Sequence, residues 1–324
     1  MFDVITVGSS TIDVFAKTKV SELIKLKGGD LLAYPVGSKL LIDNLQFTTG
    51  GGATNTAVCL ARLKNKVACI TKTGSGANSQ KVINHLKREN IDCSFIVKDK
   101  KGRTGYSIIL DSIDHDRTIL TFKGSNNDLR FSELSKAKLN TKWFFFCTMM
   151  GESFNTLKKL AKYAEDNNIK IAFNASPYLA EKGIAYSKEI LKRTDIFVLN
   201  KEEARLMSKK DKVEDCLKAL QKLAKIVVIT DGKNQVYAYE GNLMYTLYPR
   251  AVKVVESTGA GDAFASTFLA GMMKKDYIEF ALKLACTNAQ SVVQHFGAKN
   301  KLLSYNQALS ELKKHPLKVT KRQL

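Results

Sequence analysis

Residues 258–262, Thr-Gly-Ala-Gly-Asp, place a carboxylate at the point where an apolar stretch gives way to small residues. Small residues let an anion approach the backbone, and the first amides of a helix offer donors together with the positive end of the helix dipole. Asp262 could therefore take a proton from a hydroxyl while Gly259, Ala260 and Gly261 hold developing negative charge. The alternative is a tight turn in which Asp262 caps the helix. The residues alone leave both interpretations open.

A second cluster, residues 50–55, reads Gly-Gly-Gly-Ala-Thr-Asn. Gly51 and Gly52 would let the backbone close in on a small polar ligand, and Asn55 offers a donor and an acceptor together. The alternative is a flexible turn between a strand and a helix. Asp13, after the first apolar run, could accept hydrogen bonds from two hydroxyls or could be a solvated loop acid.

A third cluster holds Asn200 and Glu203, which three-residue spacing puts on one face of a helix. Taken alone, this pair favours a capped helix start. The four histidines and six cysteines show neither ligand spacing nor a nucleophile partner. The sequence therefore predicts no metal centre built on these residues and no disulfide framework, and scattered cysteines suit a reducing compartment.

Length and charge limit the classes of protein that remain. A chain of 324 residues with a net charge of +20 invites a nucleic-acid interpretation. Its lysines are spread along the whole chain, however, without the aromatic interleaving of a single-strand platform and without a zinc finger, so nucleic acid is not the predicted partner. No apolar run has the length of a bilayer span, and the first residues lack a basic leader, so we expect a cytoplasmic protein.

The elements that would position these clusters follow from the order of apolar and amphipathic segments. Short apolar runs alternate with amphipathic helical patterns, which predicts an α/β fold with a doubly wound, mostly parallel sheet flanked by helices. Such a fold puts ligands at the carboxyl ends of its strands. Two β-rich pieces, residues 14–49 and 104–122, interrupt the alternation, and the second has a polar turn at 114–116. We expect one domain over residues 1–324, with these pieces forming a small β-sheet lid, and a mainly helical chain after Asp262.

Four motifs, in order along the chain, resemble those of the PfkB, or ribokinase-like, family of carbohydrate and nucleoside kinases. The long motifs are GGGATNTAVCLARLKNKVACITKTG and ESTGAGDAFASTFLAG, and the short ones are NKEEA and TDG. The resemblance extends over essentially the whole chain. It implies that Asp262 is the base that deprotonates the acceptor hydroxyl, and that Gly259–Gly261 form the anion hole for the transferring phosphoryl group.

The resemblance also implies two sets of binding residues. The sugar hydroxyls would be held by Asp13, Gly51, Gly52 and Asn55. ATP and Mg²⁺ would be held by Asn200, Glu203, Thr230, Gly232, Thr258 and Asn288, with Glu203 reaching the metal through water and Asn288 lying near the base. At the position where potassium-dependent members carry Asp, this chain has Glu256, which weighs against a monovalent-cation site.

The activity implied is that of an ATP-dependent kinase transferring the γ-phosphoryl group to a hydroxymethyl hydroxyl of a small, ribose-like sugar. A nucleoside kinase is the alternative, with an aromatic wall for the base supplied by Phe15, Tyr34, Phe47 or Tyr106. A non-catalytic sugar or nucleotide sensor is a third possibility, against which the intact Asp262 argues. The lid would also offer a surface for a homodimer.

Overall fold

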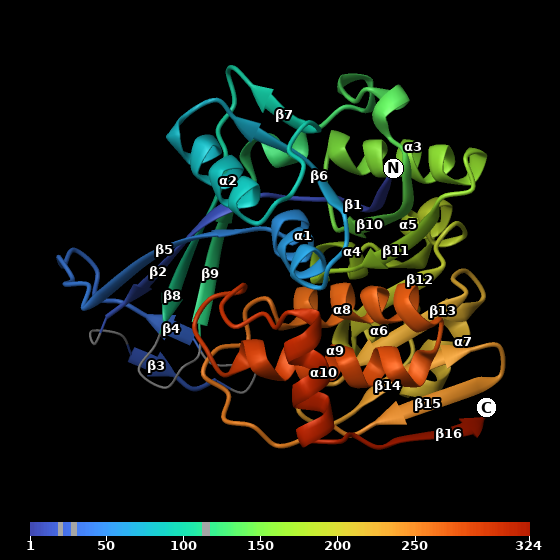
Figure 1. Cartoon of the computed structure of the whole chain (residues 1–324). Coiled ribbons are helices and arrows are strands. Elements are labelled where there is room, and N and C mark those ends of the chain that lie inside the picture. Colours follow the sequence, from blue (N-terminus) through green and yellow to red (C-terminus); the bar gives the residue numbers. More distant parts are fainter. Residues whose placement is uncertain (19–21, 27–30, 112–116) are drawn as a thin grey trace.

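A ten-stranded sheet runs through the molecule and carries helices on both faces (Figure 1). The computed structural model describes residues 1–18, 22–26, 31–111 and 117–324. The strand order is β16-β15-β14-β13-β12-β11-β10-β1-β6-β7. These strands are β1 (Phe2–Val7), β6 (Val67–Gly74), β7 (Ile96–Asp99), β10 (Thr141–Cys147), β11 (Lys170–Asn174), β12 (Ile196–Asn200), β13 (Ile226–Thr230), β14 (Val236–Glu240), β15 (Leu243–Leu247) and β16 (Val319–Gln323).

The strands from β7 to β13 pair in parallel, and β14, β15 and β16 extend that sheet in antiparallel fashion. This confirms the predicted fold class. The chain after Asp262 is mainly helical, as expected, and it ends in one strand, β16. β16 is a lysine- and arginine-bearing edge strand that pairs with β15, and charged residues suit an edge exposed to water.

Helices cover both faces of the large sheet because its strands alternate apolar side chains between two cores. Phe144 and Phe146 pack into one core and Phe145, between them, into the other. The helices are α1 (Gly52–Arg62), α2 (Ala77–Arg88), α3 (Glu152–Asp166), α4 (Pro177–Ala180), α5 (Gly183–Leu191), α6 (Lys201–Ser208), α7 (Val213–Gln221), α8 (Ala260–Lys275), α9 (Ile278–Val293) and α10 (Tyr305–Lys314). Among the described residues, no helix combines the length and apolarity that a membrane span requires.

A second, four-stranded sheet projects from one side of the molecule (Figure 1). Its order is β5-β2-β8-β9, with β2 at Thr11–Lys17, β5 at Asn44–Gly50, β8 at Gly105–Asp111 and β9 at Arg117–Phe122. A short pair, β3 (Glu22–Ile24) and β4 (Leu31–Ala33), lies in the connection between β2 and β5. The expected turn at 114–116, and residues 19–21 and 27–30 of the expected lid, fall outside the described residues.

The register of the small sheet sorts its side chains onto two faces. Asp13 pairs with Thr48 on one side and Ser107 on the other, so these three side chains share a face. The neighbouring residue, Ile12, points to the opposite face with its partner Thr49. We refer to the face that carries Asp13 as the site face.

Candidate active site

Polar side chains gather at the carboxyl ends of parallel strands in the large sheet. β11 ends at Asn174, β12 at Asn200 and β13 at Thr230. Asn200 and Thr230 are direct neighbours in the register of β12 and β13. This edge is where parallel α/β sheets bind ligands.

Asp262 lies at this edge as the third residue of α8, and it is half-buried. Its carboxylate oxygens accept hydrogen bonds from two side-chain amides, Oδ2 from Asn55 Nδ2 at 2.9 Å and Oδ1 from Asn174 Nδ2 at 3.2 Å. Gly259, not Asp262, holds the N-cap position of α8. The helix-cap alternative for Asp262 is therefore not what the structure shows, and lone pairs remain on both oxygens to accept a proton.

The start of α8 beside Asp262 has an open approach for an anion. Gly259 has φ of +80°, and a Cβ there would collide with Ala298, so the turn requires glycine. Nothing lies within 4 Å of the place where a Cβ of Gly261 would stand. The amide of Ala260 donates to the carbonyl of Ser257, whereas the other first-turn amides have no partner within the helix by geometry. This arrangement can hold negative charge next to the carboxylate.

The turn into α1 brings Asn55 to the same place. Gly51 has φ of +96°, and a Cβ there would meet the backbone of Ser9, so only glycine lets the two loops approach this closely. Asn55, in the first turn of α1, then reaches Asp262 with its amide nitrogen. Its amide oxygen accepts from Lys299 Nζ at 2.8 Å. Both polar groups of Asn55 are thus engaged within the protein, so a sugar hydroxyl would have to replace one of these partners.

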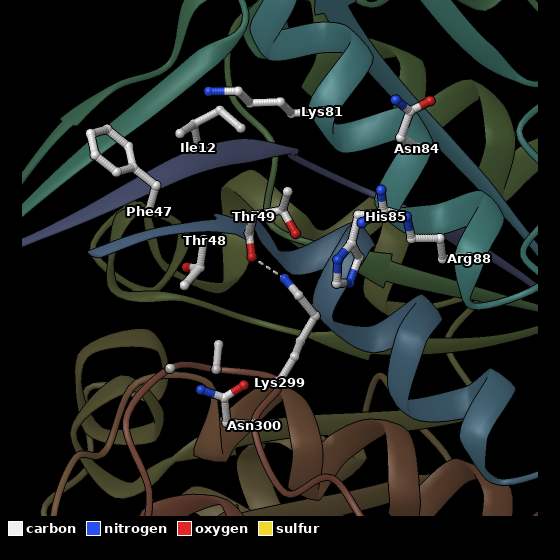
Figure 2. Close-up of a pocket in the computed structure, with 12 residues that line it drawn as sticks. Ile12, Phe47, Thr48, Thr49, Lys81, Asn84, His85, Arg88, Lys299 and Asn300 are labelled. Carbon is white, nitrogen blue, oxygen red and sulfur yellow. Dashed lines mark hydrogen bonds between the residues drawn. The ribbon is translucent and has the colours of Figure 1, made fainter. Parts of the chain in front are cut away.

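Lys299 is a buried cation in this site, with 7% of its surface exposed. It lies in the segment between α9 and α10 and also donates to the backbone carbonyl of Thr49 (Figure 2). An amide whose oxygen is held by an ammonium must turn its NH₂ group the other way. Lys299 therefore directs the Asn55 amide nitrogen toward Asp262.

Asp13 lies inside β2 and is nearly buried on the site face. Thr11 Oγ1 donates to its Oδ1 at 2.7 Å, and Ser107 also hydrogen-bonds to the carboxylate. Its charge and that of Asp262 are close enough to influence each other. The structure thus brings Asp13, Asn55 and Asp262 together around Lys299.

Burial and charge act in opposite directions on these groups. Burial raises the pKa of both the Asp262 and the Asp13 carboxyl groups, while hydrogen bonds and the charge of Lys299 oppose the rise. Burial lowers the pKa of Lys299 to about 8, although both carboxylates oppose that change. The two acids and the lysine form one coupled group whose net charge changes as Lys299 titrates.

A cavity of about 190 Å³ opens beside Asp262. Gly52, Asn174 and Asp262 line it, together with the residues that follow β10, Thr148 to Met150. The volume is smaller than that of a site for a drug-sized ligand. It suits a small polar molecule that presents a hydroxyl to Asp262.

Asn200 and Glu203 form a reciprocal capping box at the start of α6. Asn200 Oδ1 accepts from the Glu203 amide, and Glu203 Oε2 accepts from the Asn200 amide, both at 2.8 Å. Burial raises the pKa of Glu203 to about 7, and the charges of Glu202 and Asp262 add to the rise. A nearby cation would relieve this repulsion. One carboxylate with water and phosphate oxygens is a usual Mg²⁺ environment, so the residues fit a metal held through water.

The other residues expected to bind the nucleotide, Gly232, Thr258 and Asn288, have different surroundings. Gly232, with φ of +53°, has open space around it and follows Thr230 at the end of β13. The Thr258 hydroxyl is buried and has no hydrogen-bond partner among the described residues. Asn288 is completely buried, and its side chain bonds to Thr267 at 2.8 Å and to the Leu303 amide at 2.9 Å. Both polar groups of the Asn288 amide are thus engaged, one with α8 and the other with the segment before α10.

Glu256 connects two loops next to the start of α8. Its Oε1 accepts from the Thr258 amide and its Oε2 from the Gly297 amide, each at 3.1 Å. A carboxylate used in this way holds the 256–259 turn against the 297–300 segment.

Two residues of the site, Asn174 and Lys299, are not predicted by sequence reasoning. Asn174 has the signal of a polar residue at the end of an apolar strand, which could have been used. Lys299 carries no local signal, because it is one lysine among many and its partner Asn55 is 244 positions away.

Comparison with known proteins identifies a matching family and several relatives of this chain. A family profile described as pfkB family carbohydrate kinase matches residues 1–304. A ribokinase of Lactococcus lactis is 26% identical over 86% of this chain and 90% of its own length. An uncharacterized sugar kinase of Archaeoglobus fulgidus is 27% identical over 75% of this chain and 97% of its own. The crystal structure of a nucleoside kinase from Methanocaldococcus jannaschii superposes with a TM-score of 0.81 at 22% identity, covering 97% of this chain and 99% of that one.

Proposed function

The chain belongs to the PfkB family of carbohydrate kinases and is a phosphotransferase, and from that premise we propose that it is an ATP-dependent sugar kinase. The acceptor is a small, ribose-like sugar, and the γ-phosphoryl group goes to its hydroxymethyl oxygen. The observation that carries the proposal is the carboxylate of Asp262, held by Asn55 and Asn174 at the mouth of a small cavity and beside the open start of α8.

Each group has a part in the transfer. Asp262 takes the proton from the acceptor hydroxyl as that oxygen attacks the γ-phosphorus. The first-turn amides of α8 stabilise the charge on the transferring phosphoryl oxygens. Asp13 accepts hydrogen bonds from sugar hydroxyls on the site face of the small sheet, which serves as a lid. Gly51 and Gly52 let the sugar approach the backbone.

ATP would lie along the ends of β12 and β13, near Asn200, Thr230 and Gly232, with Thr258 at the phosphates. Mg²⁺ would be held through water by Glu203, and it supplies positive charge that offsets the charge of the phosphates. We expect the enzyme to act in the cytoplasm.

A nucleoside kinase is the second candidate function. Two of the four aromatic residues expected to form a wall for the base lie on the face opposite the site face. Phe47 pairs with Val14 and Tyr106 pairs with Ile12, and both partners point away from the side of Asp13. Phe15 alternates with Asp13 and stays on the site face, where it could contact a base. Tyr34 follows β4, outside the four-stranded sheet, so this candidate rests on Phe15 and Tyr34.

The test is ADP release with a panel of acceptors: pentoses, hexoses, sugar phosphates and ribonucleosides, each with Mg·ATP. We expect the highest kcat/KM with ribose or a close analogue, and a lower value with 2-deoxy analogues because Asp13 would lose a hydroxyl partner. A preference for ribonucleosides would select the second candidate. ADP release that no acceptor raises above the background rate would support the sensor and end the kinase proposal.

A further inference from the structure

A groove of about 370 Å³ lies between α2, the end of β5 and the 297–300 segment (Figure 2). It shares no lining residue with the cavity beside Asp262. Ile12 lines it, whereas the next residue, Asp13, points to the opposite face of the small sheet. Neither Asn55 nor Asp262 lines it. Lys299 is shared, since its side chain borders the groove and its ammonium reaches Asn55.

The groove is strongly basic. Lys81, Asn84, His85 and Arg88 occupy positions i, i+3, i+4 and i+7 of α2, so they form one face of the helix, and Figure 2 shows them lying over the groove. Lys299 comes from the opposite wall. No acidic residue lines the groove in the part of the chain that the structure describes.

The nearest carboxylate acting on His85 is already paired. Glu89 accepts two hydrogen bonds from Arg62, at 2.6 and 3.0 Å. Glu89 therefore does not neutralise the charges of Lys81 and Arg88, whereas the charge of Lys299 is offset by the carboxylates of Asp13 and Asp262.

Two buried polar atoms at the groove have no hydrogen-bond partner among the described residues, Thr49 Oγ1 and His85 Nε2. A buried polar atom without a partner destabilises a protein unless something else binds it. Burial, with the charge of Lys299 adding to it, lowers the pKa of His85 to about 4, so the ring is neutral near pH 7. A neutral imidazole and a hydroxyl can each still donate one hydrogen bond.

We propose that this groove is a binding site for a phosphate-bearing small molecule. A phosphate group offers several acceptor oxygens at once, which matches a set of donors that includes an arginine, lysines, a hydroxyl and an imidazole. The volume exceeds that of inorganic phosphate, and Phe47 and Asn84 line the space that an organic part would fill. Apart from the shared Lys299, none of the residues that would carry the transfer lines the groove, so binding there can be measured without the kinase reaction.

Binding in the groove would change the electrostatic environment of Asp262. An anion near Lys299 acts on the same ammonium that holds Asn55, and Asn55 holds Asp262. The ligand is either an effector that binds without being consumed or an acceptor whose own phosphate lies in the groove. An effector and an acceptor would both bind through a phosphate group, but only the acceptor would be phosphorylated by the enzyme.

The experiment follows the imidazole resonances of the four histidines by NMR while inorganic phosphate, and then glycerol 3-phosphate, is added at constant ionic strength without ATP or sugar. His85→Gln assigns the His85 signal. Arg88→Glu removes a groove cation. Lys87→Glu makes the same charge change one position away on α2, at an exposed residue that does not line the groove.

We expect a saturable shift of the His85 signal, with affinity weakened about tenfold or more in Arg88→Glu and about unchanged in Lys87→Glu. An unmoved His85 signal would overturn the proposal. So would equal weakening in the two variants, which is the result of general attraction to a chain of charge +20. If glycerol 3-phosphate binds, ADP release with sugar phosphates as acceptors then separates a consumed ligand from an effector. Binding without any kinase activity would leave this site standing and the proposed function rejected.

Discussion

At the scale of single residues, Asp262 is the group on which the transfer should depend most. Asp262→Asn keeps the size of the side chain and removes its ability to accept a proton, so we expect turnover to fall by about 10²–10⁴-fold. Binding of ATP and the thermal transition should stay close to those of the wild type. Steady-state ADP release and a binding titration measure the two effects.

A matched control for this variant lies on the same helix. Asp276→Asn makes the identical change at the C-cap of α8, where asparagine tolerates the left-handed backbone. It should leave turnover unchanged. Near-wild-type turnover in Asp262→Asn would remove Asp262 from the mechanism.

The titration of Lys299 should set an upper pH limit on the activity of the enzyme. Its pKa is lowered to about 8, so the ammonium is charged below pH 8 and loses its proton as the pH rises through that value. With Asp13 and Asp262 ionised, the local charge then changes from about −1 to about −2, which opposes the approach of anionic ATP. We expect kcat/KM for ATP to fall above about pH 8.

Two variants test this assignment. In Lys299→Met the alkaline limb should be absent and the plateau of kcat/KM lower, because the charge is missing at every pH. In Lys299→Arg the limb should move to higher pH, since arginine stays charged. An alkaline limb near pH 8 that persists in Lys299→Met would assign it to another group.

At the scale of elements, the sequence predicts the sheet edge well and the contacts across it poorly. Asn200 and Thr230 end apolar runs, and parallel strands must bring such ends together. Lys299 and Asn55 meet only because the 297–300 segment folds back over α1, which no local spacing reveals. The bonds of Asn288 to Thr267 and Leu303 show the same limit, because periodicity within α9 does not say which other element a polar residue meets.

The loop pair joined by Glu256 leads to a prediction on potassium. Its carboxylate bridges the Thr258 and Gly297 amides, so each oxygen already accepts one hydrogen bond from the protein. We expect potassium chloride to raise kcat little beyond the effect of sodium chloride at equal ionic strength. Glu256→Asp shortens the acid, should weaken the bridge and should increase the difference between the two salts. A many-fold activation of the wild type by potassium alone would contradict this use of Glu256.

At the scale of the whole molecule, the two outer strands of the small sheet present apolar side chains to solvent. Leu45 and Phe47 on β5, and Leu120 and Phe122 on β9, are each about half exposed, at 48%, 57%, 53% and 53%. The register puts all four on the face opposite Asp13. A patch of this kind on a surface is typical of a protein–protein contact.

We therefore expect a homodimer formed through this face of the small sheet. Leu120→Lys places a charge in the patch on the outer strand β9 and should convert the dimer to monomer, because burying an unpaired charge costs more than the contact provides. Ile119→Lys is the matched control: Ile119 is 44% exposed on the adjacent position of β9, but its register with Ile109 turns it to the site face. Sedimentation velocity over a range of protein concentrations gives the mass of each variant. A wild type that stays monomeric at every concentration, or an Ile119→Lys variant that dissociates as Leu120→Lys does, would show that the apolar face is not the dimer contact.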